Sequence, residues 1–517
     1  MLFNSYEFLF FFLPVTLGVF FALSGYRCLR TAAAWLALVS IFFYGYWSPR
    51  YVLLLLASIA VNFAAGHLIL RCRGASRMRA AKRVLVLALV ANLGALGYFK
   101  YANFFVESLN AAAGTQWHLA PIVLPIGISF FTFTQIAFLV DTYQGKVRES
   151  RIVPYILFVT YFPHLIAGPV LHHAEMMPQF ARAETYRFRL DNFLLGMGFF
   201  LIGLFKKVVL ADGIQPFVAP VFDSDPAYAL TLLEAWGGVL AYTLQLYFDF
   251  SGYSDMAIGL SKMFNVDLPL NFNSPYKATS IVEFWRRWHM TLSRFLRDYL
   301  YIALGGNRRG RLQRYTNLML TMLLGGLWHG AGWTFFVWGG LHGAYLIVNH
   351  LWQALRVRYL GHDPARTSAA GRLCAAALTF LCVALAWVFF RATSFDAALR
   401  VLHGMAGLGG AALPVEWYEL QAQPWAAALA LPFAPLEAFG GLRQLGWIAV
   451  LLLVVWTCPN SQTLMGRMDG LVRARLAAPV RRERWGWFSL GGMTACVFLL
   501  AAISASHGIS EFIYFNF

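Results

Sequence analysis

Long runs of apolar residues recur along almost the whole chain, and they constrain its fold more than any other feature. A helix needs about 20 largely apolar residues to cross a bilayer. Hydrocarbon offers the backbone no hydrogen-bond partner, so such runs are expected to be helical. The sequence therefore predicts an all-α polytopic membrane protein with about twelve spans. The runs lie at about 8–24, 31–47, 51–70, 84–101, 122–141, 192–211, 231–250, 315–330, 333–353, 373–391, 444–457 and 486–506.

The composition supports the bilayer as the solvent of this chain. Of its 517 residues, 59% are hydrophobic and 13% are charged, whereas a soluble domain has about 25% charged residues. The net charge is +17, and a strongly positive charge is also typical of nucleic-acid-binding proteins. Here the basic residues occur in short clusters between apolar runs, which is typical of cytoplasmic loops. We therefore expect membrane lipids, and no nucleic acid, among the partners.

The basic clusters also predict the orientation of the spans. The connection between Arg71 and Arg83 is crowded with Arg and Lys and should be cytoplasmic. Counting spans from there places both termini, the loops at about 102–121 and 212–230, and a longer segment at about 392–440 on the outer side. The two outer loops contain no Lys or Arg. The other loops assigned to the cytoplasm contain Arg27, Arg30, Lys146, Arg148, Arg151, Arg356, Arg358, Arg467, Arg473, Arg475, Arg481, Arg482 and Arg484.

Two stretches do not fit a simple span. The segment at about 153–171 is apolar, but Pro163, His164 and Pro169 interrupt it. The segment at about 251–314 is aromatic and basic together. Irregular backbone at membrane depth survives only where protein or a water-filled cavity covers it. We therefore interpret both stretches as re-entrant or interfacial pieces that line a central cavity.

Several common site types are absent from the sequence. The cysteines form no C-x-x-C pair, and most lie in or beside apolar runs, so we expect neither a disulfide framework nor a metal site. No serine nucleophile elbow, H-E-x-x-H motif or P-loop occurs in a convincing context. The first apolar run lacks a basic leader and a clear cleavage site, so it is interpreted as a retained span.

His329 is the most suggestive ionisable residue. Such residues are expensive inside a membrane and often functional. His329 follows the uncharged run from Leu318 to Trp328, and glycines surround it at Gly325, Gly326 and Gly330. An imidazole can take a proton from an alcohol near neutral pH. A core histidine bonded to a neighbouring carbonyl explains the residue equally well in isolation. The Trp328 and glycine setting favours the functional interpretation.

His289 is a second candidate, in the segment Trp285-Arg-Arg-Trp-His. The spacing of Trp285, Trp288 and His289 suits one face of a helix. The pair Arg286 and Arg287 suits the phosphates of coenzyme A or of a phospholipid. An interfacial helix with Trp and Arg at headgroup level is the simpler explanation of the residues alone.

Other polar residues could orient a histidine or bind substrate. Asp249, Asp255 and Asp298 are candidates, although pairing with a nearby arginine is the simpler role for each; for Asp298 the partner would be Arg294 or Arg297. Asn307 could bind substrate or act as a turn residue after two glycines.

Further histidines are less clear. His164 lies between prolines and suits a turn inside the membrane, with or without a role in substrate binding. His342 could support His329 or serve packing. His172 and His173 are interpreted as loop residues.

Taken in order, several segments resemble the membrane-bound O-acyltransferase family, and most closely its bacterial alginate O-acetylation-type branch. The resemblance runs from end to end. The matching segments are Met1-Leu-Phe-Asn-Ser5, Phe8 to Pro14, Gly97-Tyr-Phe-Lys-Tyr-Ala-Asn103, Leu124-Pro-Ile-Gly-Ile-Ser-Phe130, Phe162-Pro-His-Leu-Ile-Ala-Gly-Pro169, Tyr247 to Gly259, Glu283 to Ser293, Arg297 to Arg308, Leu324 to Gly330, Trp387-Val-Phe-Phe-Arg391 and Phe512-Ile-Tyr-Phe-Asn-Phe517.

The resemblance implies a fold and an activity. The fold would be a single domain over 1–517, a ring of tilted helices around a tunnel, with N-terminal helices at 1–121, a core at 122–353 and C-terminal helices at 354–517. His329 occupies the family's invariant histidine position, His289 matches a second functional histidine of the bacterial branch, and Asn307 lies in a polar motif near the tunnel. The chain would be a multi-pass protein of the bacterial inner membrane.

The implied reaction is transfer of an acetyl group from cytoplasmic acetyl-CoA, a substrate, with no cofactor. The acceptor would be an exported polysaccharide, and an outer-side acetyltransferase and a polysaccharide synthesis and export complex would be partners. Two other functions stay open: a transporter of a small molecule or lipid-linked sugar, since broken helices also suit that class, and a non-catalytic scaffold of a secretion complex.

Overall fold

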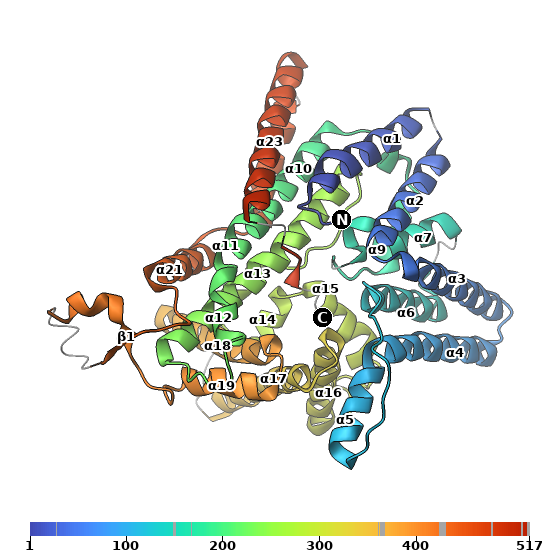
Figure 1. Ribbon diagram of the computed structural model, residues 1–517. Helices are drawn as coiled ribbons and strands as arrows, with labels where there is room; N and C mark the ends of the chain where they lie inside the picture. Colours follow the sequence, from blue (N-terminus) through green and yellow to red (C-terminus); the bar gives the residue numbers. More distant parts are fainter. Residues whose placement is uncertain are drawn as a thin grey trace. The chain divides into compact units, whose positions relative to one another are not determined.

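The computed structural model describes most of the chain (Figure 1). The chain divides into two compact units. The first unit comprises Met1–Phe205, Gly252–Asn271 and Ser461–Asn516, and the second comprises Lys206–Ser251 and Phe272–Asn460. Arg27, Arg148 and the end of the C-terminal aromatic motif lie outside the described residues. The described residues are 1–26, 28–147, 151–166, 168–359, 361, 368–422, 431–476, 479–507 and 510–513.

Helices are the only regular secondary structure among the described residues of the first unit. Glu7–Phe12 and Gly97–Tyr101 are short π-helical stretches at the ends of longer helices, and Pro49–Tyr51 and Ala183–Tyr186 are 3₁₀ turns. The α-helices are α1 (Leu13–Gly25), α2 (Leu29–Trp47), α3 (Val52–Gly74), α4 (Met78–Leu96), α5 (Ala102–Ala113), α6 (Ile128–Gln144), α7 (Ile152–Thr160), α8 (Phe162–Leu165), α9 (His173–Phe180), α10 (Leu190–Phe205), α22 (Ser461–Leu476) and α23 (Pro479–His507).

The second unit is also built from helices, with one small pair of strands. Strands β1 (Leu413–Pro414) and β2 (Phe433–Ala434) pair in parallel. Helix α13 (Leu232–Met263) contributes residues to both units. The other elements are η5 (Lys206–Ala211), α11 (Asp212–Ile214), η6 (Gln215–Phe217), α12 (Ala219–Phe222), η7 (Pro275–Lys277), α14 (Ile281–Arg287), α15 (Met290–Phe295), η8 (Leu296–Tyr301), α16 (Arg311–His329), α17 (Trp333–Tyr359), α18 (Ala369–Arg391), α19 (Phe395–Met405), η9 (Val415–Ala422) and α21 (Gly441–Thr457).

The expected spans all contain helix, which confirms an all-α polytopic membrane protein. Within the described residues, 6 helices are long and apolar enough to cross a bilayer, or 7 if the bent pair of α21 and α22 is one span. The other expected runs form helices that are shorter, such as the 17 residues of α6, or that carry polar residues, such as α16. The 6 segments are Glu7–Gly25, Leu29–Trp47, Pro49–Gly74, Met78–Ala113, Leu190–Phe222 and Ala369–Arg391.

One of the two interrupted stretches is broken as expected. Between 153 and 171 the chain forms α7 and then the four-residue α8, with Tyr161 at the break in a non-helical conformation (φ −50°, ψ 111°). Pro163 lies in the first turn of α8. Proline is favoured there because the first N–H groups of a helix make no hydrogen bond within it, so the missing N–H costs none. The side chains around the break are buried, so protein covers the irregular backbone, as a membrane environment requires.

The expected start of the second stretch, at 251, is wrong. Helix α13 continues without a break to Met263, and the short helices begin only with η7 and α14. The reason lies in the glycines, which allow close helix packing and do not end the helix. A Cβ on Gly196 of α10 would lie 2.6 Å from the carbonyl oxygen of Gly259 in α13, and one on Gly203 would meet the carbonyl of Gly252. Small residues at helix contacts are typical of membrane proteins.

Helices α3, α4 and α6 pack side by side in the first unit (Figure 1). Their contact is mostly apolar, but the amides of Asn62 and Asn92 donate to each other at 3.1 and 2.6 Å, and Gln135 donates to the hydroxyl of Ser58 at 2.9 Å. Buried amides that satisfy one another join membrane helices at little cost. The apolar core of the contact consists of Ala65, Ile69, Ala81, Leu85, Ala88 and Leu139.

Candidate functional site

Helices α16 and α17 of the second unit form a tightly packed hairpin that positions His329. A Cβ on Gly326 would collide with the carbonyl oxygen of Phe335, and one on Gly339 would collide with that of Met322. These glycines let the two backbones approach more closely than any other residue would permit. The hairpin therefore fixes the end of α16, where His329 is the last helical residue.

His329 lies inside a cage of aromatic rings. Its side chain is buried, and its ring centroid lies 4.9 Å from that of Trp328, 5.1 Å from Trp338 on α17 and 5.2 Å from Phe390 on α18. Three elements thus enclose one imidazole in an apolar setting. In such surroundings a proton transfer is shielded from water.

His289 is brought next to His329 by a sharp break in the backbone. Helix α14 ends at Arg287, Trp288 is extended, and His289 has a left-handed conformation with φ 42°. Its buried ring lies 4.8 Å from Phe250, 6.2 Å from Trp328 and 6.4 Å from His329, between centroids. Left-handed backbone at a residue other than glycine costs about 1–3 kcal/mol and clusters at functional sites.

The expectation that Trp285, Trp288 and His289 share one helical face is wrong, because the helix ends between them. The three rings face different neighbours. Trp285 contacts His342 at 5.2 Å, whereas Trp288 contacts Trp387 at 5.0 Å between centroids. The break separates the three side chains and turns the imidazole of His289 towards Phe250.

His342 adds a third imidazole to the cluster. The indole Nε1 of Trp285 donates to Nδ1 of His342 at 3.3 Å, so we assign the proton of the neutral ring to Nε2. Trp338 lies between the two histidines of the hairpin, 4.8 Å from His342 and 5.1 Å from His329. The indole Nε1 of Trp338 is buried and has no hydrogen-bond partner among the described residues. It is an available donor beside His329.

The two arginines before His289 have different surroundings. Arg287 forms an ion pair with Glu283 at 2.7 Å and donates to the carbonyl of Asn273 at 3.3 Å. Burial raises the pKa of the Glu283 carboxyl, but hydrogen bonds from Thr279 and the charge of Arg287 outweigh burial, so this pKa lies below its usual range. Arg286 is exposed and has no ion-pair partner in the described chain, so it alone is available to a phosphate group.

The remaining residues proposed from the sequence lie elsewhere. Asp298 forms an ion pair with Arg297 at 2.7 Å, one of the two expected partners. Asn307 is exposed in the turn before α16, and the buried Asn317 holds that turn by donating to the carbonyl of Gly306 at 2.8 Å. His164 belongs to the first unit, where its Nε2 lies 3.1 Å from the carbonyl of Phe158. The structure thus gathers His329, His289 and Trp328 from the proposed set.

Two buried ionisable residues differ from the sequence interpretation. Asp249 pairs with a lysine, and not with an arginine: Lys207 Nζ lies 2.8 Å from Asp249 and 2.9 Å from Asp212. His173 is not a loop residue, because it begins α9 and its buried Nδ1 lies 3.0 Å from Asp141. The partners in both pairs are far apart in sequence, so no local pattern indicated them.

The protein is thus an all-α membrane protein that buries a pair of imidazoles among aromatic rings, a combination suited to an integral-membrane enzyme. The sequence model of the membrane-bound O-acyltransferase (MBOAT) family matches residues 34–382. The chain belongs to this family and is an acyltransferase, which confirms the resemblance described above.

Individual relatives show the same relationship. The chain is 45% identical over 440 residues to the peptidoglycan O-acetyltransferase of Helicobacter pylori, covering 80% of this chain and 81% of the relative. It is 46% identical over 419 residues to a probable alginate O-acetylase of Azotobacter vinelandii, covering 79% of each. The teichoic acid D-alanyltransferase of Streptococcus thermophilus is 27% identical over 236 residues, covering 44% of this chain and 57% of the relative.

Proposed function

We propose that the protein is an O-acetyltransferase that passes an acetyl group from cytoplasmic acetyl-CoA across the membrane for O-acetylation of an exported polysaccharide. The relatives named as a peptidoglycan O-acetyltransferase and an alginate O-acetylase support the acetyl group and the class of acceptor. The observation that carries the proposal is the pair of buried imidazoles, His289 and His329, with ring centroids 6.4 Å apart in one aromatic cluster.

In the proposed mechanism His329 acts on the acceptor hydroxyl. Its imidazole accepts the hydroxyl proton while the oxygen attacks the thioester carbonyl. The carbon–sulfur bond then breaks, and the coenzyme A sulfur leaves with the proton that His329 returns. Trp338 Nε1, buried beside His329, is a donor for the oxygen on which negative charge develops. His289 assists proton transfer or holds the acyl end of the donor.

Donor binding is assigned to the cytoplasmic side of the site. Arg286 is the residue of its pair with no ion-pair partner in the described chain, so it would attract the phosphates of acetyl-CoA, and Arg287 would keep α14 in place through Glu283. The thioester end alone would then reach the histidines. We expect an outer-side acetyltransferase and a polysaccharide synthesis and export complex as partners in the bacterial inner membrane.

The test is His329→Ala in membranes, with His403→Ala as a matched control, because His403 is exposed on α19. Acetyl transfer from radiolabelled acetyl-CoA should fall by roughly 10²–10⁴-fold in His329→Ala and stay unchanged in the control. Wild-type transfer by a correctly inserted His329→Ala protein would refute the catalytic assignment. If the wild-type protein leaves the thioester uncleaved while a solute crosses the membrane, the protein is a transporter.

A further inference from the structure

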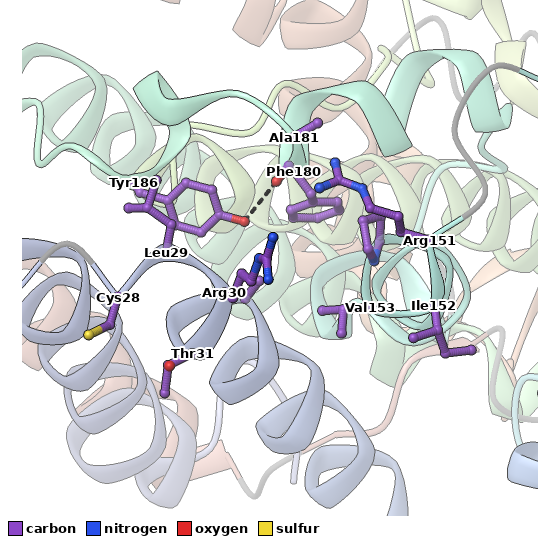
Figure 2. Close-up of a pocket in the computed structure, with 12 residues that line it drawn as sticks. Cys28, Leu29, Arg30, Thr31, Arg151, Ile152, Val153, Phe180, Ala181 and Tyr186 are labelled. Atoms are coloured by element: carbon purple, nitrogen blue, oxygen red, sulfur yellow. Dashed lines mark hydrogen bonds between the residues drawn. The ribbon is translucent and has the colours of Figure 1, made fainter.

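A cavity of about 870 Å³ lies in the first unit, where α2 and α7 begin and α9 ends (Figure 2). Ligand cavities in proteins typically measure about 300–1,000 Å³. The lining is mixed: apolar residues such as Leu29, Val153 and Phe180 lie beside polar and charged ones. The hydroxyl of Tyr186 closes one side by donating to the carbonyl of Phe180 at 2.8 Å. This space is separate from the histidine cluster, whose residues all belong to the second unit.

Two arginines give this cavity a positive charge. Arg30 comes from the first turn of α2, and Arg151 is the residue immediately before α7; Figure 2 shows both extending into the region around Phe180. No carboxylate is among the described residues that line the cavity. Guanidinium groups bind phosphate oxygens through two parallel hydrogen bonds. The lining thus combines a cationic end with an apolar wall.

The backbone adds to the attraction for an anion. Helices α2 and α7 both begin at the cavity, and the side chain of neither N-cap residue, Cys28 or Arg151, makes a capping hydrogen bond. The start of a helix carries a partial positive charge and unsatisfied N–H donors, which favour anions. Both arginines also belong to loops that the charge pattern assigns to the cytoplasm, the side on which anionic lipids are concentrated.

We propose that this cavity binds the phosphate of an amphiphilic anion. The apolar wall favours a membrane phospholipid with a net negative headgroup, whose phosphate contacts Arg30 and Arg151 while its acyl chains leave along the apolar surface. The phosphates of a soluble nucleotide could bind the two arginines in the same way, but they would make no contact with the apolar wall. The bound phosphate would link the start of α2 to the start of α7. The proposed lipid site does not depend on the acetyl transfer proposed above.

The experiment measures the melting temperature and ligand affinity of the purified full-length protein with three probes: phosphatidylglycerol, phosphatidylcholine and inorganic pyrophosphate. Phosphatidylglycerol should raise the melting temperature, and phosphatidylcholine should not. Arg30→Gln with Arg151→Gln should weaken phosphatidylglycerol binding on the order of tenfold or more. The matched control is Arg50→Gln with Arg443→Gln, which removes equal charge from exposed positions elsewhere and should bind as the wild type does.

The outcomes separate the sources of the phosphate and can overturn the site. If only pyrophosphate has an effect, and that effect requires Arg30 and Arg151, the anion site is supported but its natural ligand is a soluble phosphate. Equal binding of both lipids, or equal affinity in the double variant and the wild type, overturns the proposal. Because the double variant could lose stability for other reasons, Arg30→Gln alone is measured too, and wild-type affinity in that folded protein would also contradict the site.

Discussion

Replacing Gly339 by alanine tests whether the close contact of α16 and α17 positions His329, the proposed catalytic histidine. A Cβ on Gly339 would overlap the carbonyl oxygen of Met322 and lie 3.0 Å from its carbonyl carbon and 3.1 Å from the Cα of Leu323. All three atoms are backbone of the facing helix, so no rotation of a side chain can relieve the overlap. The two helices must move apart locally, by about the 1 Å needed to restore an ordinary van der Waals distance.

Two opposing effects determine the free energy of unfolding of Gly339→Ala. Overpacking of a tight contact costs about 1–3 kcal/mol, whereas alanine in place of glycine in a helix gains about 1 kcal/mol. The net change should therefore be a destabilisation between roughly 0 and 2 kcal/mol. The catalytic effect should be larger, because Trp338 precedes the substituted residue and lies against His329. A displacement of about 1 Å at a reacting group can lower the rate about 10²-fold.

Gly340→Ala is the matched control, since it makes the same chemical change one residue later. A Cβ on Gly340 meets only Cδ2 of Leu323, at an ordinary 3.5 Å. This variant should be as active as the wild type and gain up to about 1 kcal/mol of stability. Acetyl transfer from radiolabelled acetyl-CoA and thermal unfolding in the same membrane preparation measure both effects. Equal activity of the two variants would show that the close contact does not position His329.

Three further variants test His289 and its surroundings. His289→Asn should keep the fold, since asparagine tolerates the left-handed backbone at φ 42°, but should lose acetyl transfer; near-wild-type turnover would remove His289 from the mechanism. Arg286→Gln should raise the KM for acetyl-CoA without changing the melting temperature, whereas Arg287→Gln, which breaks the partly exposed pair with Glu283, should lower unfolding stability by about 0.2–1 kcal/mol. Identical effects of the two arginine substitutions on KM and stability would contradict this division.

The sequence could propose candidate site residues where a local pattern suffices. His329 was a candidate because ionisable residues after an uncharged run such as the one ending at Trp328 are expensive inside a membrane and often functional. The helical class followed in the same way from the length of the apolar runs. Both inferences need only the chemistry of neighbouring residues and the thickness of the bilayer.

The cage around His329 could not be predicted, because its members come from other helices. Trp338 and Phe390 resemble any other aromatic residues of apolar helices, and only the packing of α17 and α18 brings them to the imidazole. The pairs Lys207–Asp249 and Asp141–His173 could not be predicted for the same reason, because only packing brings their members together. The continuation of α13 past Ser251 was missed for a different reason: glycine is a helix breaker in water, but at Gly252 and Gly259 it serves close packing with α10.

The two histidines reach their common position by opposite structural means. His329 ends a long regular helix whose glycine contacts fix its position, whereas His289 lies at a break between helices, where its backbone is left-handed. Irregular backbone of this kind persists in a membrane protein only where other protein groups cover it. The rings of Phe250, Trp328 and His329 provide that cover for His289. The aromatic cluster therefore covers the strained residue and would also exclude water from the proposed reaction, so substitutions in it should affect folding and catalysis together.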